Sequence, residues 1–351
     1  MKTSYFRPSI DEMSAYTPGE QPKVSNLVKI NTNENPYPPA PGVFETIRKF
    51  NADRLRLYPQ PTSDAVRKII AELNNVEPSM VIAGNGSDDI LNIAIRSFCA
   101  PDLPLACFTP SYSLYPVLAA MQQAPVLKIS LNSDFSIPDD VLKQTTNANL
   151  LIIARPNAPT GNSFPIAQMQ KIIKGFDGIV LVDEAYADFA DDNCMALVKD
   201  FPNLIVSRTL SKSYALAGLR FGYAVASPSI INGMMKIRDS YNVDMLTQEV
   251  ASAALLDQEY LSKTKETILK TRALLERELT SLGFKYIASQ ANFLFAMPPD
   301  RDGQRLFDAL RADGIIVRYF PGEITGQYVR ISVGSDVEIE RLLQTAKRIY
   351  N

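Results

Sequence analysis

Between residues 62 and 226 the sequence alternates short apolar strands with amphipathic helices. Residues 62–75 show a helical period, with Val66, Ile69, Ile70 and Leu73 on one face. Short apolar runs that alternate with helices form a largely parallel sheet that is covered on both faces. The predicted class is therefore α/β. The expected strands are 81–83, 105–108, 126–129, 150–154, 179–182, 204–207 and 221–226.

The pattern changes near residue 230, and this change predicts a second, smaller α+β domain. Long helical stretches fill 229–281. Strands at 292–296, 315–318 and 328–332, and helices at 303–312 and from 336, are expected after them. A chain of 351 residues exceeds the length at which one core stops growing. The expected division is an N-terminal arm with part of the small domain at 1–45, a large domain at 46–240, and a small domain at 241–351.

Composition excludes several classes of protein. The chain has no histidine, which rules out Ser-His-Asp triads, Cys-His pairs and histidine-ligated metals, and no metal site is predicted. A net charge of −2 without a basic block points to neither nucleic acid nor a membrane surface. Three scattered cysteines form neither a disulfide nor a zinc pattern, so a reducing, cytoplasmic setting is expected.

Lys212 lies in the segment with the most chemical information, Ser207-Arg-Thr-Leu-Ser-Lys-Ser-Tyr-Ala-Leu-Ala-Gly-Leu-Arg-Phe-Gly-Tyr223. A lysine in a shaped pocket can lose its proton and attack a carbonyl to form an imine. Thr209, Ser211 and Arg220 together suit a phosphate, because arginine gives paired charge-assisted hydrogen bonds. The alternative is a surface lysine in a polar loop.

Three further loops follow apolar strands. In Val180-Leu-Val-Asp-Glu-Ala-Tyr186, Asp183 falls where open α/β sheets place ligand-binding groups, although it could simply cap the next helix. Ala154-Arg-Pro-Asn-Ala-Pro-Thr-Gly161 is a tight loop that offers the amide of Asn157, favours a cis X-Pro bond, and could be an ordinary turn. Gly84-Asn-Gly-Ser-Asp-Asp89 opens a helix and suits a phosphate, but it has neither Rossmann nor P-loop spacing.

In order and spacing, these motifs resemble the aspartate-aminotransferase superfamily of pyridoxal 5'-phosphate (PLP) enzymes, fold type I, over nearly the whole chain. The resemblance implies that Lys212 forms an imine with the cofactor, that Asp183 pairs with its pyridinium nitrogen, and that Tyr186 and Asn157 contact its phenolate oxygen. It also implies a stacking tyrosine, Tyr112, and a phosphate cradle made of Gly86, Ser87, Asp88, Thr209, Ser211 and Arg220.

Two further implications concern the partner subunit and a departure from the family pattern. Tyr58, in Leu57-Tyr-Pro-Gln-Pro61, resembles the tyrosine that reaches the phosphate of the neighbouring subunit, which implies a homodimer with shared active sites. Arg155 and Ala158 stand where relatives more often carry asparagine. Asn157 is retained, so the ring contact survives, and Arg155 is left without a role beyond that of a surface charge.

The substrate is predicted from a narrower resemblance. Ile30-Asn-Thr-Asn-Glu-Asn-Pro-Tyr37, Leu57–Pro61, Thr209–Arg220 and Gly314-Ile-Ile-Val-Arg318 look like histidinol-phosphate aminotransferases. The family uses the arginine of Tyr328-Val-Arg-Ile-Ser-Val-Gly334 for an anionic group, and a second arginine beside it suits a phosphate dianion. A structural ion pair is the alternative. The substrate-binding residues implied are Arg330, Arg318, Tyr16 and Asn33.

The implied reaction carries the amino group of histidinol phosphate to 2-oxoglutarate, giving imidazole acetol phosphate and glutamate in histidine biosynthesis. Lys212 would then move the proton of the substrate carbon. Two related activities use the same cradle: transamination of aromatic amino acids and decarboxylation of threonine phosphate. A different class, the non-catalytic effector domain of a transcription regulator, is disfavoured because the chain has no helix-turn-helix extension and no basic segment.

Overall fold

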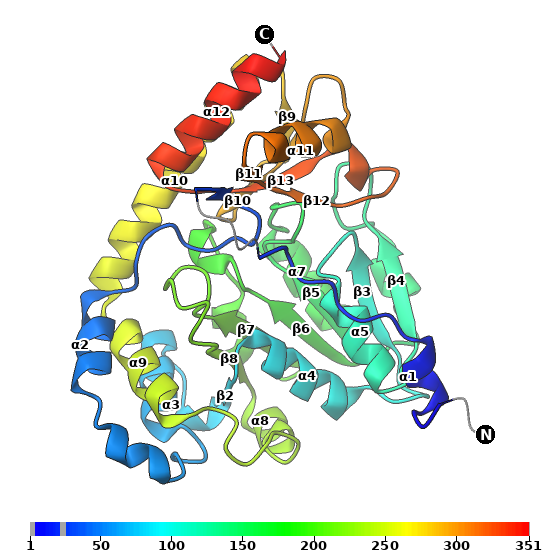
Figure 1. The fold of residues 1–351 in the computed structure, drawn as a ribbon. Coiled ribbons are helices and arrows are strands. Elements are labelled where there is room, and N and C mark those ends of the chain that lie inside the picture. The colour runs from blue at the N-terminus through cyan, green and yellow to red at the C-terminus, as the bar shows by residue number, and fades with distance from the viewer. Residues whose placement is uncertain (1–3, 22–25, 351) are drawn as a thin grey trace.

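A seven-stranded sheet forms the centre of the large lobe (Figure 1). The structure is a computed structural model and describes residues 4–21 and 26–350. The strand order is β2-β8-β7-β6-β5-β3-β4, and β8 alone runs antiparallel to its neighbours. This arrangement confirms the predicted α/β class. The strands are β2 (Val81–Gly84), β3 (Leu105–Thr109), β4 (Val126–Ser130), β5 (Leu150–Ala154), β6 (Ile179–Asp183), β7 (Leu204–Thr209) and β8 (Gly222–Ala226).

The apolar strands divide their side chains between two cores. In β5, Leu151 and Ile153 point into one core, and Leu150 and Ile152 point into the other. This period-two division is the geometry of a strand that is covered on both faces. Helices α3, α7 and α9 cover the first face, and α4, α5 and α8 cover the second.

The helices of the large lobe are α2 (Pro41–Lys49), α3 (Asp64–Asn74), α4 (Ser87–Phe98), α5 (Leu114–Met121), α6 (Val141–Gln144), α7 (Ile166–Gly175), α8 (Pro228–Met234) and α9 (Met245–Leu256). Short 3₁₀ turns lie at Ala52–Arg56, Pro78–Met80, Ala187–Phe189, Met195–Lys199 and Thr325–Gln327. Within residues 4–21 and 26–350, no helix combines the length and the apolar character needed to cross a membrane.

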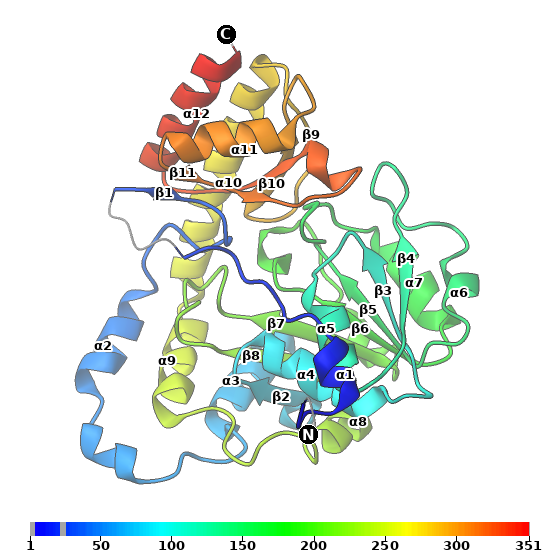
Figure 2. The ribbon, with the colours of Figure 1, turned by 45° about the vertical axis from the view of Figure 1, so that its right-hand side comes forward.

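A four-stranded antiparallel sheet, ordered β12-β13-β10-β9, forms the small lobe with three helices (Figure 2). One predicted strand, 315–318, was wrong as a single element. It is two strands in different sheets, because Ile315 pairs with the arm and Arg318 pairs with β13. The elements are α10 (Gln258–Ser281), β9 (Lys285–Tyr286), β10 (Phe293–Met297), α11 (Gly303–Ala312), β11 (Ile315–Ile316), β12 (Arg318–Tyr319), β13 (Val329–Ser332) and α12 (Asp336–Tyr350).

The N-terminal arm joins both lobes. It begins with a short helix, α1 (Pro8–Glu12), which lies near the end of α5, where the guanidinium of Arg7 donates to the carbonyl of Met121. The chain then runs across the large lobe, and β1 (Val28–Lys29) pairs in parallel with β11 (Figure 1). Arm residues therefore contact both lobes.

The change from large-lobe to small-lobe packing falls between α9 and α10. Val250, Ala251 and Ala254 of α9 belong to the core under the large sheet. Leu275 and Leu279 of α10 belong to the core of the small lobe. The division at residues 45 and 240 stays a prediction.

Gly222 sits where β8 passes under the loop that opens α4. A Cβ atom there would lie 2.3 Å from the amide nitrogen of Ser87 and 2.5 Å from the carbonyl carbon of Gly86. We expect Gly222→Ala to lower the free energy of unfolding by roughly 1–3 kcal/mol, because strand and loop must separate. Denaturant unfolding of both proteins measures this difference.

Gly233→Ala is the matched control. Gly233 lies in α8 and has open space where its Cβ would be. The substitution should be neutral or stabilising by up to about 1 kcal/mol, as helix propensity predicts. Equal effects of the two substitutions would show that the close approach at Gly222 carries no energetic weight.

Candidate active site

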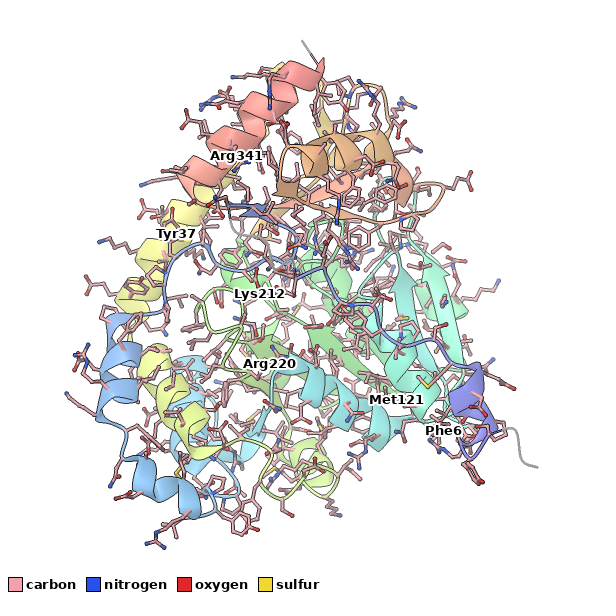
Figure 3. The ribbon with its side chains drawn as sticks, in the orientation of Figure 1. Phe6, Tyr37, Met121, Lys212, Arg220 and Arg341 are labelled. Atoms are coloured by element: carbon pink, nitrogen blue, oxygen red, sulfur yellow. The ribbon has the colours of Figure 1, made fainter. Side chains whose placement is uncertain are left out.

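A cavity of about 540 Å³ opens at the carboxyl ends of the parallel strands, and residues of both lobes and the arm line it. Figure 3 labels Lys212 and Arg220 near the middle of the molecule, beneath the small lobe. Most of the residues predicted from the sequence meet here. They are Tyr16, Asn33, Ser87, Asp88, Tyr112, Asp183, Tyr186, Thr209, Ser211, Lys212, Arg220, Arg318 and Arg330.

Lys212 comes from the loop that joins β7 to β8. Its Nζ donates a 3.0 Å hydrogen bond to the carbonyl of Thr32 in the arm, and it lies 5.7 Å from the centre of the Tyr186 ring. Lys212 is the only lysine among the described residues that line the cavity. The alternative of a surface lysine therefore does not hold.

Asp183 is the last residue of β6, and its side chain is almost completely buried. Burial raises the pKa of this carboxyl to about 6, and a hydrogen bond from Tyr115 opposes part of the rise. The Tyr115 hydroxyl donates to Oδ2 at 2.7 Å, and Ser207 Oγ lies 3.4 Å from Oδ1. The helix-cap alternative is wrong, because the next helical turn has Tyr186 at its cap position.

Tyr186 is held by the arm. The amide of Asn33 donates to the Tyr186 hydroxyl at 2.9 Å, and the carbonyl oxygen of the same amide accepts from Ser332 Oγ at 2.8 Å. The Tyr186 ring packs edge-on against Phe293 with centroids 5.1 Å apart. Asn33 therefore connects Tyr186 to strand β13 of the small lobe.

The loop before α4 and the guanidinium of Arg220 form an anion cradle. Gly86 has a φ of +85°, and a Cβ there would lie 2.6 Å from Arg220 Nη2, so glycine is required for this approach. The first N–H groups of α4, which begins at Ser87, have no partner within the helix. Ser211 Oγ lies 3.4 Å from Arg220 Nη1 and 3.0 Å from Thr209 Oγ1.

The carboxylate of Asp88 contacts two residues beside this cradle. Its Oδ2 lies 3.2 Å from Arg220 Nη2, and its Oδ1 accepts from the Tyr112 hydroxyl at 3.2 Å. The carboxylate would repel a phosphate, whereas the N–H at the start of α4 would attract one. Tyr16 packs edge-on against Tyr112, with centroids 5.8 Å apart, and so brings the arm over the cavity.

Arg318 and Arg330 are direct cross-strand partners of β12 and β13. Two like charges opposite each other destabilise a sheet, so an anion between them would be bound. The Arg330 guanidinium carbon lies 5.3 Å from the ring centres of both Phe293 and Phe320. Burial and the charge of Arg318 lower the pKa of Arg330.

The hydrogen bonds that Arg318 and Arg330 make within the protein do not use all of their N–H donors. Arg330 Nη2 donates to the carbonyl of Asn31 at 2.9 Å, but its buried Nε finds no partner among the described residues. Arg318 donates to the carbonyls of Pro18 and Thr17, each at 3.2 Å. Within residues 4–21 and 26–350 neither arginine pairs with a carboxylate, so a structural ion pair does not explain them.

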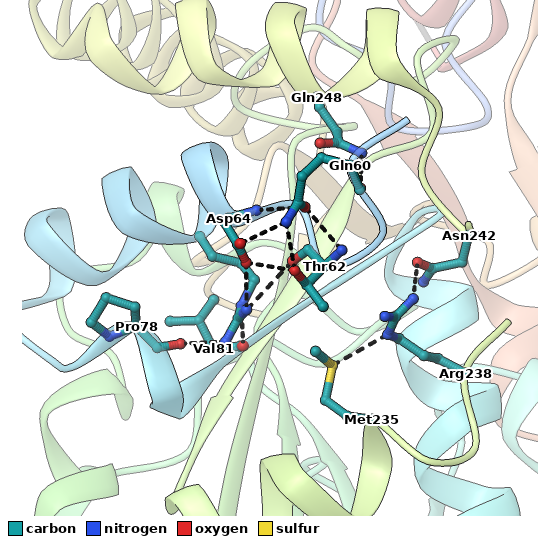
Figure 4. A network of polar contacts seen from close by, with 10 residues as sticks. Gln60, Thr62, Asp64, Pro78, Val81, Met235, Arg238, Asn242 and Gln248 are labelled. Carbon is teal, nitrogen blue, oxygen red and sulfur yellow. Dashed lines mark hydrogen bonds and ion pairs between the residues drawn. The ribbon is translucent and has the colours of Figure 1, made fainter. Parts of the chain in front are cut away.

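Three predicted residues lie outside the cavity wall: Gly86, described above, Asn157 and Tyr58. The amide of Asn157 is used within the protein: Nδ2 donates to the carbonyl of Pro110 at 3.0 Å, and Oδ1 accepts from Ser111 at 2.7 Å. Tyr58 is 80% exposed and stacks on Tyr241 with ring centres 4.5 Å apart. Polar contacts around Gln60 hold the loop that follows Tyr58 (Figure 4).

Arg155 corrects an expectation. It is not a surface charge, because its side chain is 1% exposed. Its Nε donates to the carbonyl of Phe164 at 2.7 Å, and its guanidinium pairs with Asp192. Both neighbouring prolines, Pro156 and Pro159, follow cis peptide bonds. Arg155 therefore ties the loop that carries Asn157 to Phe164 and Asp192.

Comparison with known proteins places this arrangement in a family. The model of "Aminotransferase class I and II" matches residues 25–345. The chain belongs to the class I and II aminotransferases. Among its relatives are histidinol-phosphate aminotransferases of Syntrophotalea carbinolica, 44% identical over 96% of this chain and 97% of that one, and of Geobacter sulfurreducens, 42% identical over 98% and 99%. Within the class, the aminotransferase groups with these enzymes.

Solved structures agree with the fold. The histidinol-phosphate aminotransferase of Sinorhizobium meliloti, solved in complex with pyridoxal-5'-phosphate, superposes with a TM-score of 0.89 at 24% identity, covering 99% of both chains. Thermus thermophilus aspartate aminotransferase with maleate gives 0.79 at 21% identity, covering 92% and 91%. Both confirm fold type I for this aminotransferase.

The raised pKa of Asp183 predicts a pH-dependent stability. Below about pH 4 the carboxyl is protonated in folded and unfolded chains alike, so it contributes no difference. Between about pH 4 and 6 only the folded chain keeps the proton, so stability falls as pH rises and stays lower above pH 6. Asp183→Asn cannot ionise and keeps an acceptor for Tyr115, so it should be the more stable protein at pH 8, by on the order of 1–3 kcal/mol.

Urea unfolding of the protein without added cofactor, at pH 4 and pH 8, measures both proteins. The gain from Asp183→Asn should shrink strongly at pH 4, where the wild-type carboxyl is already neutral. A gain of the same size at both pH values would mean that the carboxyl is not penalised by burial.

Proposed function

We propose that the chain transfers the amino group of histidinol phosphate to 2-oxoglutarate, with pyridoxal 5'-phosphate as its cofactor. The observation that carries this proposal is the content of one cavity. Its described lining residues include a single lysine, a buried carboxyl with a raised pKa, and two arginines that face each other and pair with no carboxylate in residues 4–21 and 26–350. The protonated pyridine nitrogen of a cofactor would neutralise the buried carboxylate of Asp183, and the phosphate of a substrate would neutralise the two arginines.

The residues present fit pyridoxal phosphate. Its phosphate would be held by Arg220, Ser211, Thr209 and the N–H groups that begin α4. Gly86 keeps that space open, since a side chain there would collide with Arg220. Asp183 would hold the pyridine nitrogen, because a buried carboxylate is stabilised by a cation beside it. Tyr186 would serve the phenolate oxygen, and Tyr112 would stack on the ring. Asn157 would also reach that oxygen if its Nδ2 gave up a hydrogen bond that it makes within the protein, such as the one to the Pro110 carbonyl.

When bound, the cofactor supplies an electron sink and carries the amino group between the two half-reactions. Lys212 Nζ takes the proton from the amino-bearing carbon of the substrate, because no other lysine lines the described cavity and the chain has no histidine. Asp183, once ionised, favours a protonated nitrogen in front of it. Tyr16 of the arm packs edge-on against Tyr112, and both rings line the cavity.

The arginine pair selects the substrate. Arg318 and Arg330 are cross-strand partners that both line the cavity, and two guanidinium groups suit the three oxygens of a phosphate dianion better than a single carboxylate. Arg330 would also receive a carboxylate of 2-oxoglutarate in the second half-reaction. Asn33 and Tyr16, both at the cavity wall, would contact the donor from the arm.

We further propose a cytoplasmic homodimer with shared active sites. Tyr58 projects into solvent away from the cavity of its own chain, as expected if it reaches the phosphate of a partner subunit. Exposed apolar side chains of the same region, Leu55, Leu57 and Tyr241, would be covered by that partner. The three cysteines are buried and unpaired, which suits a reducing compartment.

A panel of donors tests the proposed activity on purified protein with added pyridoxal phosphate. We expect the highest kcat/KM with histidinol phosphate, with formation of glutamate from 2-oxoglutarate. A preference for phenylalanine would indicate an aromatic aminotransferase. Release of carbon dioxide from threonine phosphate would indicate a decarboxylase. No turnover of any donor by protein that binds the cofactor would favour a binding domain.

The same panel tests the arginine pair. Arg318→Met should lower kcat/KM for histidinol phosphate by about 10–100-fold, because it removes charge-assisted hydrogen bonds to a dianion. Arg305→Met is the control, since Arg305 is exposed on the same lobe, pairs with Asp300 and does not line the cavity. Equal losses in the two variants would overturn the assignment of Arg318.

A further inference from the structure

Asn35, in the arm, donates hydrogen bonds to the backbone of the loop that carries Lys212, residues 210–221. Its Nδ2 donates to the carbonyl of Lys212 at 3.2 Å and to the carbonyl of Ser213 at 3.0 Å. Its Oδ1 accepts from the amide of Tyr37 at 3.0 Å, which fixes the orientation of the side-chain amide. Both donor hydrogens of one asparagine are thus used on two consecutive peptide units of the loop.

A cluster of charged residues in the large lobe, Asp188, Arg208 and Glu184, contacts the same loop. Ser213 Oγ donates to Asp188 Oδ2. The other oxygen of Asp188 accepts from Arg208 Nη1 at 2.8 Å, and Arg208 Nη2 lies 2.7 Å from a Glu184 oxygen. Arg208 belongs to β7, and Glu184 follows Asp183 at the end of β6. These contacts therefore connect Ser213 to the end of β6, the strand that carries Asp183.

Such supports matter because the loop lies outside the helices and strands. The backbone hydrogen bonds that hold it from within are those of turns, such as the one from the Ala215 amide to the Lys212 carbonyl at 3.3 Å. Between Leu210 and Phe221 the chain forms only turns, and Ala215 has a φ of +57°. A lysine side chain has four rotatable bonds, so its amine is placed only as well as its Cα is fixed. Reaction rates fall steeply when a reacting group is displaced by about 1 Å.

We propose that Asn35 and Asp188 are positioning residues that set the place of Lys212 Nζ, Asn35 by holding the backbone carbonyls of Lys212 and Ser213 and Asp188 by holding the Ser213 hydroxyl. This inference rests on the proposed function, in which that amine bonds to the cofactor. Neither Asn35 nor Asp188 lines the cavity. Both residues act on the chemistry through the position of Lys212.

The test follows formation of the covalent link between Lys212 and pyridoxal phosphate by visible absorbance, after mixing cofactor-free protein with the cofactor. The rate constant should fall by about tenfold in each of two variants. Asn35→Ala removes the hydrogen bonds to the carbonyls of Lys212 and Ser213, and Ser213→Ala removes the hydrogen bond to Asp188. The pH at which the absorbance of the link titrates should also shift, because the nitrogen occupies a changed environment.

Asn203→Ala is the matched control. Asn203 is half-buried like Asn35, and its Nδ2 also donates to two backbone carbonyls, of Ile173 at 3.1 Å and Gly178 at 3.0 Å. Those bonds lie at the opposite edge of the sheet from the cavity. The control should lose thermal stability to a similar degree and should keep the wild-type rate and titration.

Each outcome decides between distinct claims. Slowed linkage in Asn35→Ala and Ser213→Ala, with a wild-type rate in the control, supports positioning. Wild-type rates and titrations in all variants overturn it and leave a structural role. If Asn35→Ala does not fold, Ser213→Ala alone decides by the same criterion. If wild-type protein forms no link with the cofactor, the proposed function fails instead.

Discussion

A carboxyl group almost out of contact with water, that of Asp183, is the constraint on which the site is built. Burial raises its pKa to about 6, so at neutral pH it carries a charge that its surroundings penalise. Tyr115 and Ser207 each offer one hydroxyl, which offsets part of this penalty. A cation in front of the carboxylate would offset the rest, and that unmet requirement favours a ligand with a protonated nitrogen.

The parallel sheet explains why the other groups surround this carboxyl. Strands β2, β3, β5, β6 and β7 all end at one edge, so the loops that follow them meet there. The small lobe contributes Arg318 and Arg330, and the arm contacts both lobes. Asn33 and Asn35 in that arm touch Tyr186 and the Lys212 loop. The arm thereby ties the anion-binding end of the cavity to its reactive end.

The sequence alone predicts the parts that depend on local pattern. The apolar strands can be predicted because burial on both faces requires continuous apolar runs. The motif residues can be placed at the site because they lie directly after those strands. Long-range partners are not legible in the same way. Tyr115 faces Asp183 across 68 positions of chain, and the carbonyl of Thr32 meets Lys212 across 180. The strand at 315–318 divides because its partners come from the distant arm and from β13.

Burial of single charged residues is the other limit. Nothing in the local pattern around Arg155 indicates that its guanidinium lies inside the protein, since its partner Asp192 is far along the chain. The roles of Lys212, Tyr186 and Asn157 were predicted from motif resemblance and stay predictions. Lys212 and Tyr186 line the cavity, whereas Asn157 lies outside its wall and accepts a hydrogen bond from Ser111, which lines it. Contacts that cross between lobes needed the three-dimensional arrangement.

Borohydride reduction of the cofactor-loaded protein, followed by peptide mass mapping, tests the central claim most directly. The account predicts that the reduced cofactor is attached to the ε-nitrogen of Lys212 and that the label disappears in Lys212→Ala. Lys29 is the informative alternative, because its ammonium contacts Thr32 and Glu34 at the cavity wall. A label on Lys29, on any other lysine, or on none would contradict the account.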